Sequence, residues 1–153
     1  MATTNVTLSI SSADLTTDAL SLSNTKTLFN AGTSTGMSQV EGVARKFLAG
    51  DAAAAVNYTI ANADDGKFTE DGAHKIYIKN TSTSTSDYLV VIIGVDGGSG
   101  SYTGQEIGRL YGGDFLYMPW SADLAGGGTD SDIIIQTPSG SVNQEVEYLI
   151  IFE

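Results

Sequence analysis

The chain has 153 residues, of which 18 are acidic and 7 are basic, and its formal net charge is −11. This length suits one domain with a real core, whereas the acidic balance excludes partners recognised mainly through cations, namely nucleic acid and anionic membrane surfaces. Cysteine is absent, which excludes disulfides and thiolate metal sites.

The N-terminal part of the chain alternates apolar with polar residues over residues 5–10 and again over residues 20–22. A period of two predicts strands with one apolar face. Two readings of residues 1–12 stay open: an arm that adds a strand to a neighbouring subunit, or a strand within the protein's own sheet. Between the two alternating stretches, a polar turn or one helical turn is expected at residues 11–18.

Residues 42–49 predict a further strand, on which Arg45 and Lys46 are adjacent. Such charges protect an edge strand from pairing with other chains, and the alternative is a basic patch at an interface. Residues 56–60 are rich in β-forming residues and predict another strand. The acidic segment 62–72 is expected to be a solvated turn, because it lacks the ligand register of an EF-hand calcium loop, the weaker alternative.

The most regular alternation lies in residues 75–80, where the isoleucines are expected to face the core. The Thr and Ser residues of 81–87 predict a hairpin loop. The continuous apolar run 88–94 predicts a central strand covered on both faces. The glycine-rich segment 96–104 is expected to be the most flexible stretch of the chain.

The stretch 106–120 is interpreted as a β-hairpin that ties the two sheets of a sandwich together. Residues 106–110 and 114–118 are its predicted strands, and a Gly-Gly pair between them tolerates the positive φ angles of a tight turn. Pro119 lacks the N–H that a strand ladder needs, so the second strand is expected to end there.

The last part of the chain contains a glycine-rich loop at residues 125–129 and predicted strands at residues 132–137 and 145–153. The final strand is apolar on both faces, so we expect it to be held in the fold. In total, roughly eight to ten short strands without an amphipathic helix predict an all-β, antiparallel β-sandwich or barrel forming a single domain, with residues 1–12 as a possible N-terminal arm.

Catalytic chemistry has little support in the sequence. His74 is the only histidine, so a catalytic triad or a zinc site would depend on it alone, and we expect it to be structural. No cofactor fingerprint is present, and we expect no enzyme activity, no cofactor and no metal. A glycosidase built on a carboxylate pair, with candidates Glu106, Asp114 and Asp123, is the distant alternative.

Interface residues are better supported than catalytic ones. Tyr111 and Trp120 stand at predicted strand ends and are expected to make surface contacts, because Tyr and Trp dominate interface hot spots. With Tyr117 they alternatively form a sugar platform. Arg109 is expected to face solvent or to pair with an acidic residue of a neighbouring subunit.

Several segments, distributed over most of the chain in a constant order, carry a family resemblance: residues 14–23, 42–46, 75–82, 106–114, 118–120, 132–133 and 146–148. The most specific reads Ile-Gly-Arg-Leu-Tyr-Gly-Gly-Asp, followed by Pro-Trp. In these segments the chain resembles small virion structural proteins of tailed bacteriophages, particularly those of marine and cyanobacterial hosts.

The resemblance implies a jelly-roll-like β-sandwich on the phage particle, made in the host cytoplasm. The first expectation is a capsid decoration or cement protein, a homotrimer that binds the major capsid protein and stabilises the assembled shell. The alternative is a component of the tail, baseplate or fibre, or a carbohydrate- or receptor-binding module. No catalytic motif is among the resembling segments.

Overall fold

The computed structural model describes residues 3–13, 19–122 and 131–153. This part of the chain contains strands but no helix, and therefore no helix that could cross a membrane. The all-β prediction is confirmed. The strands are β1 (Asn5–Ser12), β2 (Leu20–Thr27), β3 (Gln39–Leu48), β4 (Val56–Ala61), β5 (Lys75–Asn80), β6 (Tyr88–Gly98), β7 (Ser101–Tyr111), β8 (Phe115–Pro119), β9 (Asp132–Thr137) and β10 (Gln144–Phe152).

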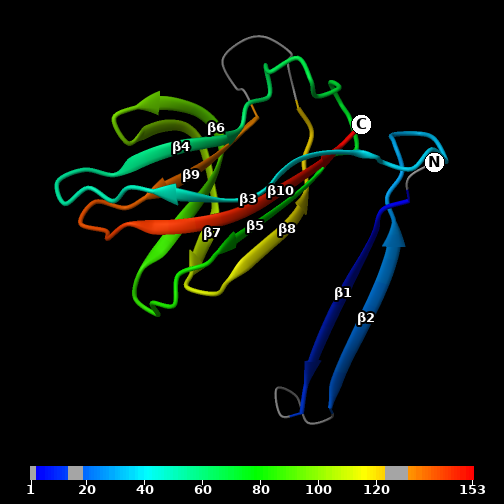
Figure 1. The fold of residues 1–153 in the computed structure, drawn as a ribbon, viewed down its shortest axis with the longest axis horizontal. Coiled ribbons are helices and arrows are strands. Elements are labelled where there is room, and N and C mark those ends of the chain that lie inside the picture. The colour runs from blue at the N-terminus through cyan, green and yellow to red at the C-terminus, as the bar shows by residue number, and fades with distance from the viewer. Residues whose placement is uncertain (1–2, 14–18, 123–130) are drawn as a thin grey trace.

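Eight of these strands form two packed sheets of four strands each (Figure 1). Sheet I has the strand order β3-β10-β5-β8, and sheet II has the order β4-β9-β6-β7. Every pairing within the two sheets is antiparallel. The chain passes from one sheet to the other at every connection except β6 to β7, which gives the sandwich a jelly-roll-like strand order.

The core lies between the two sheets, where alternate residues of each strand meet. Ile76 and Ile78 of β5 are fully buried there, as the alternation of this strand predicts. Sheet II contributes Leu89 and Val91 from β6, together with buried isoleucines of β9. Because a strand turns successive side chains to opposite faces, the same alternation leaves β5 with one outward-facing row.

The central position predicted for β6 is also confirmed. Its other face is buried as well, in a second cluster formed by Val90 and Ile92 with Ile134 of β9, and Tyr88 and Tyr102 pack against it. Tyr102 reaches this cluster because the β6–β7 hairpin curls over the outer face of sheet II (Figure 1).

The turn of this hairpin is held against the strands that it covers. The Asn57 side-chain amide of β4 donates to the Ser101 carbonyl at 2.6 Å, and the Gln136 amide of β9 donates to the Gly100 carbonyl at 2.8 Å. That residues 96–104 are the most flexible stretch stays a prediction, although these two hydrogen bonds restrain the turn. Its glycines permit a tight bend, and hydrogen bonds with two neighbouring strands then hold the bend in place.

The prediction of a hairpin over residues 106–120 needs a correction. Its two strands exist as β7 and β8, but β7 pairs with β6 in sheet II and β8 pairs with β5 in sheet I. The stretch therefore connects the sheets, as expected, without being a hairpin. The loop at residues 81–87 is likewise a connection between sheets, from β5 to β6, and not the hairpin loop that was predicted.

These two connections lie against each other, which explains why each resembles a hairpin turn in sequence. The Gly112 N–H donates to the Ser84 carbonyl at 3.1 Å, and the Gly113 N–H donates to the Asn80 carbonyl at 3.0 Å. Gly113 has a φ of 89°, which favours glycine. The turn residues therefore allow two loops that are distant in sequence to form hydrogen bonds with each other.

Two further predictions concern residues that the structure does not describe, wholly or in part. Most of the turn expected at residues 11–18 and all of the glycine-rich loop at residues 125–129 lie outside the described residues.

Candidate functional site

A two-stranded arm extends from one end of the sandwich (Figure 1). It consists of β1 and β2, which pair antiparallel from Asn5 opposite Thr27 to Ser12 opposite Leu20, and it belongs to neither four-stranded sheet. The N-terminal strand thus pairs within its own chain, yet outside the sandwich. We call residues 5–12 and 20–27 the arm.

The arm has one apolar and one polar face. The pairing register places Val6, Leu8 and Ile10 on one face together with Leu20 and Leu22, and with Asn24 and Lys26 toward the base, whereas the opposite face carries only Ser, Thr and Asn. Leu8 and Ile10 are each 46% exposed, and Leu22 is 47% exposed. A two-stranded hairpin with an open apolar face is at best marginally stable alone in water, so covering this face would stabilise the arm.

The base of the arm is attached to sheet I. Leu28 and Met37, which flank the loop after β2, are buried against Ile151 of β10, and Val6 packs on this cluster. The Leu28 N–H donates to the Thr4 carbonyl at 2.9 Å. The base is therefore fixed on the sandwich, while the more distal Ile10 and Leu22 remain exposed.

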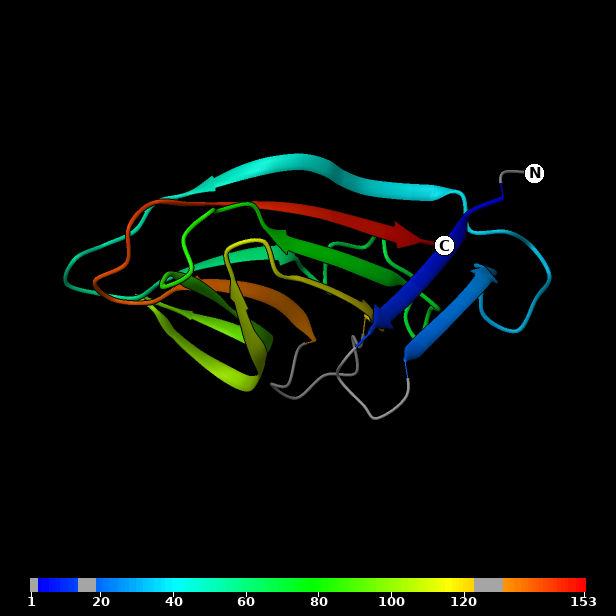
Figure 2. The same ribbon diagram turned by 90° about the horizontal axis from the view of Figure 1, so that it is seen from below.

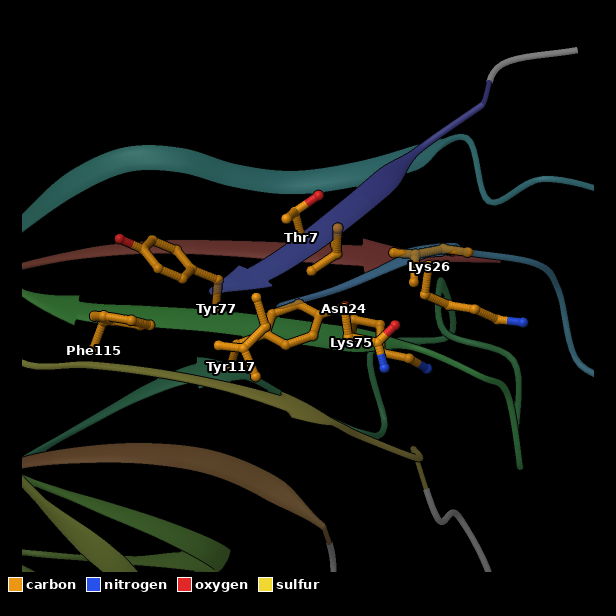
Figure 3. A pocket seen from close by; sticks show the side chains of 10 residues that line it. Thr7, Asn24, Lys26, Lys75, Tyr77, Phe115 and Tyr117 are labelled. Atoms are coloured by element: carbon orange, nitrogen blue, oxygen red, sulfur yellow. The ribbon is translucent and has the colours of Figure 1, made fainter. Parts of the chain in front are cut away.

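A groove of about 480 Å³ lies between the arm and the outer face of sheet I. Figure 3 shows side chains entering it from both sides, and Figure 2 shows the arm passing over the side of the molecule formed by β10 and β5. The groove is lined by Val6, Thr7, Leu8, Asn24, Lys26 and Leu28 from the arm side and by Lys75, Tyr77, Phe115 and Tyr117 from sheet I.

Aromatic residues dominate the sheet side of the groove. Tyr77 of β5 lies directly opposite Tyr117 of β8 and next to Leu149 of β10, so these side chains form one row across the outer face. The Phe115 ring is centred 6.3 Å from that of Tyr77, and the Phe115 residue is 60% exposed. Burial raises the pKa of Tyr77, and the charge of Glu147 raises it further.

Three lysines accompany these aromatic rings. Lys26 and Lys75 line the groove, and Lys79 lies on the same outer face as Tyr77. Within the described part of the chain, none of the three forms a salt bridge. Burial lowers the pKa of Lys75, and the charge of Glu153 partly opposes this shift. Glu147 of β10 lies directly opposite Lys79, so the outer face of sheet I carries charges of both signs beside the aromatic rings.

One polar atom beside the groove lacks a partner. The Tyr117 hydroxyl is buried and has no hydrogen bond to any described residue, and burial raises the pKa of this side chain. A buried hydroxyl without a partner costs about 1–3 kcal/mol of desolvation free energy. A molecule that covers the groove and offers a hydrogen bond would recover part of this cost.

Replacing Tyr117 by phenylalanine therefore has an unusual expected result. Tyr117→Phe removes only the unpartnered hydroxyl, so we expect the free energy of unfolding to stay the same or to rise by about 1 kcal/mol. Denaturant unfolding of the purified protein measures the change. Tyr58→Phe is the matched control, because the Tyr58 hydroxyl accepts from the Ala49 N–H at 2.8 Å, and its loss should destabilise. A clear loss of stability in Tyr117→Phe would contradict the assignment of an unpartnered hydroxyl.

The interface candidates predicted from sequence do not converge on one surface. Arg45 and Lys46 lie on β3, the edge strand of sheet I, whereas Arg109 and Tyr111 lie on β7, the edge strand of sheet II. The edge position predicted for the first pair is confirmed. An interface role for any of the four remains a prediction.

Three of these four residues are charged, and each contacts side chains of another strand or of its own strand. The Arg45 guanidinium is 3.5 Å from the Glu147 carboxylate, and the Lys46 ammonium lies 5.4 Å from the centre of the Tyr58 ring. Arg109 pairs with Glu106 at 3.2 Å and lies over a tyrosine ring. These exposed pairs contribute little to stability.

Trp120 does not lie at the surface, contrary to the prediction. It is 4% exposed, and its ring packs edge-to-face on Phe68 with centroids 4.8 Å apart. Its indole N–H donates to the Ser131 carbonyl at 2.7 Å. A single tryptophan at a strand end fits a core position as well as an interface, and sequence position alone does not separate the two.

His74 belongs to the same buried aromatic cluster. It is fully buried, 5.6 Å from the Trp120 ring, and its Nε2 lies 2.9 Å from the Thr69 carbonyl. These contacts give His74 a structural role in the core, as the sequence predicts. The described residues contain no group of three or more side chains that could hold a metal ion.

Sequence reasoning missed most of the groove. Lys26 was not singled out, and Tyr77 was only expected to face outward. The signal for Tyr77 is the alternation of β5, whose outward row is Lys75, Tyr77 and Lys79. Nothing local indicates that residues around position 6 and residues around position 117 line the same groove.

Comparison with known proteins adds little to this description. No protein-family model matches the chain, and no curated protein matches it. Among solved structures, the mitogen derived from Yersinia pseudotuberculosis aligns over 75% of this chain and 86% of its own, with 12% sequence identity and a TM-score of 0.38. A similarity this weak supports no argument about function.

Proposed function

We propose that this protein is a non-enzymatic structural protein of a tailed-phage virion, and specifically a capsid decoration protein that binds and stabilises the assembled shell. Its partner is the major capsid protein, and it acts as a homotrimer on the capsid surface. The sequence resemblance motivates this assignment. The observation that carries it is the arm, whose apolar face is left uncovered by its own chain.

The physical basis of the function is adhesion. Burying a fully exposed Leu or Ile side chain contributes about 1.5–3 kcal/mol, so covering a half-exposed one contributes roughly half of this. Leu8, Ile10 and Leu22 offer three half-exposed side chains on one ribbon. A protein that binds the assembled shell but not separated subunits stabilises the shell by linkage, by about 2.7 kcal/mol per site at a hundredfold excess over Kd. Several copies on one particle add avidity.

Heat disruption of phage particles tests the proposal. Particles that lack this protein are expected to release their DNA at a lower temperature than complete particles, and added purified protein should restore the difference. Protein carrying Leu8→Ser, Ile10→Ser and Leu22→Ser should fail to restore it. The matched control, Thr7→Ser with Ser9→Thr and Ser23→Thr on the polar face of the arm, should succeed. Equal heat resistance with and without the protein would refute the decoration role.

A tail, baseplate or fibre component that recognises a receptor is the second candidate. The row of Tyr77 and Tyr117, with Phe115 beside it, favours this candidate because aromatic faces stack on sugar rings. A glycan array measures sugar binding directly. Binding that is lost in Tyr77→Ala but kept in Tyr111→Ala, which lies on the other sheet, would support this candidate. An array without hits would count against it.

A further inference from the structure

We infer that the groove between the arm and sheet I binds an amphipathic organic anion, a molecule whose aromatic or aliphatic body carries one carboxylate or sulfonate group. The apolar body lies over the aromatic rings of sheet I, and the anionic group lies beside two lysines. The size of the groove, its lining and the placement of its charges carry the inference. It concerns the purified protein and does not depend on the capsid function.

The groove has the size and the lining of a ligand site. Its volume of about 480 Å³ falls within the range of about 300–1,000 Å³ that is typical of small-molecule pockets, which are mostly apolar with a few polar groups. The buried Leu28 forms part of its wall on the arm side, and three aromatic residues form the sheet side. An apolar body placed here would contact both the arm and sheet I.

The cationic and the aromatic side chains lie at different ends of the groove. Figure 3 shows Asn24, Lys26 and Lys75 together at one end and the rings of Tyr77 and Phe115 at the other. Phe115 is 60% exposed, so its ring is available to an apolar body. An elongated molecule with one charged group therefore fits the groove in one orientation.

The charge of the groove favours an anion. Lys26 and Lys75 are the only charged side chains among the described residues that line it, and neither has a salt bridge to a described carboxylate. The Lys75 ammonium donates to the carbonyls of Ala73 and His74. Because an ammonium has three N–H donors, one of them remains for a ligand. An anionic group at this end would supply the missing acceptor.

Two carboxylates act on the groove from outside it, and both are engaged by other groups. Glu147, whose charge acts on Tyr77, lies 3.5 Å from the Arg45 guanidinium. Glu153, whose charge acts on Lys75, accepts hydrogen bonds from two backbone N–H groups. Neither carboxylate belongs to the lining, so both reduce the attraction for an anion without occupying its place.

The Tyr117 hydroxyl offers a further donor to the ligand. It is buried and has no hydrogen-bond partner among the described residues. A hydroxyl can donate to a carboxylate or sulfonate oxygen, and hydrogen bonds to charged groups are stronger than those between neutral groups. The hydroxyl that lacks a partner in the free protein would therefore stabilise the bound anion.

Fluorescence titration with anilinonaphthalene sulfonate, an amphipathic aromatic anion, tests the inference on the purified protein. We expect saturable binding that is weakened about tenfold in Lys26→Gln and in Lys75→Gln, since each removes a charged donor. Phe115→Ser, which removes a ring from the opposite end, should weaken binding as well. Phenylnaphthylamine, which has the same rings without the sulfonate, should bind much more weakly. Decanoate should displace the sulfonate probe, whereas decanol should not.

Two variants are matched controls for this titration. Lys79→Gln removes the same charge from the outer face of sheet I, and Ile10→Ser removes an exposed apolar side chain from the arm, both outside the groove. Both should leave the affinity almost unchanged. The inference is overturned if the protein shows no saturable binding, if the neutral probe binds as tightly as the anion, or if either control weakens binding as much as Lys75→Gln.

The test separates the ligand site from the capsid role. Of the residues that line the groove, only Leu8 belongs to the three side chains assigned to the shell, and Leu8 is unchanged in every variant of the titration. A protein that restores the heat resistance of particles but does not bind the probe would overturn the ligand site alone.

Discussion

Replacing Gly94 by alanine is expected to destabilise the protein by about 3–5 kcal/mol. Gly94 of β6 pairs with Gly104 of β7 where their hairpin curls over sheet II. A Cβ atom at Gly94 would lie 2.1 Å from the Thr103 carbonyl oxygen and 2.6 Å from the Gly104 Cα. Both atoms belong to the backbone, so the clash is relieved only if the hairpin opens. Equilibrium unfolding in denaturant measures the loss.

Gly108→Ala is the matched control for this substitution. Gly108 lies on β7 as well, but a Cβ atom there would have nothing within 4 Å. We expect Gly108→Ala to change the free energy of unfolding by less than about 1 kcal/mol. If Gly94→Ala were as mild as its control, the close approach of β6 and β7 at this point would be wrong.

Trp120→Ala is the second substitution with a large expected effect, a loss of about 3–5 kcal/mol in the free energy of unfolding. The indole fills the space beside Phe68 and His74 and donates a hydrogen bond to Ser131. Removing it would leave a cavity and an unpaired carbonyl. Thermal or denaturant unfolding of the purified variant provides the measurement.

Tyr111→Ala gives the contrast, since Tyr111 is 39% exposed and its ring packs only on Tyr88 among the described aromatic rings, so it should cost less, about 1 kcal/mol. The pair separates the two roles that sequence position suggested for these residues. A Trp120→Ala protein with native stability but weakened self-association or particle binding would restore the surface role and contradict the buried position.

The strands themselves were largely predictable because their signal is local. Residues 75–80 are predicted as a strand and are observed as β5 with the same bounds. Alternation also correctly assigns its inward isoleucines and its outward Lys75, Tyr77 and Lys79. Burial of both faces of β6 follows from its continuous apolar run. In each of these cases, the pattern of apolar residues along a single strand is enough to predict which of its faces are buried.

Strand pairing was less predictable, because it depends on residues distant in sequence. A short glycine-containing connection occurs both in a hairpin and in a crossover between sheets, so residues 106–120 were interpreted as a hairpin although β7 and β8 lie in different sheets. The same limit applies to the candidate site. The apolar face of β1 is visible in sequence, but its exposure depends on what the rest of the chain leaves uncovered.

Trp120 and Phe115 illustrate this limit most clearly. Both are large aromatic residues in the same short stretch, yet Trp120 is 4% exposed and Phe115 is 60% exposed. Trp120 is enclosed by Phe68 and His74, which precede β5. Phe115 lies on the outer face of sheet I and lines the groove beside the arm. Contacts between distant segments therefore decide which aromatic residue is available to a partner.

An electron-microscopy map of intact particles, at a resolution that locates this chain, tests most directly whether the protein acts by adhesion through its arm. The expected map shows the sandwich on the outer surface of the capsid, with Leu8, Ile10 and Leu22 covered by a neighbouring chain. A map in which these three side chains face solvent, or in which the chain does not occur on the capsid, would contradict the account.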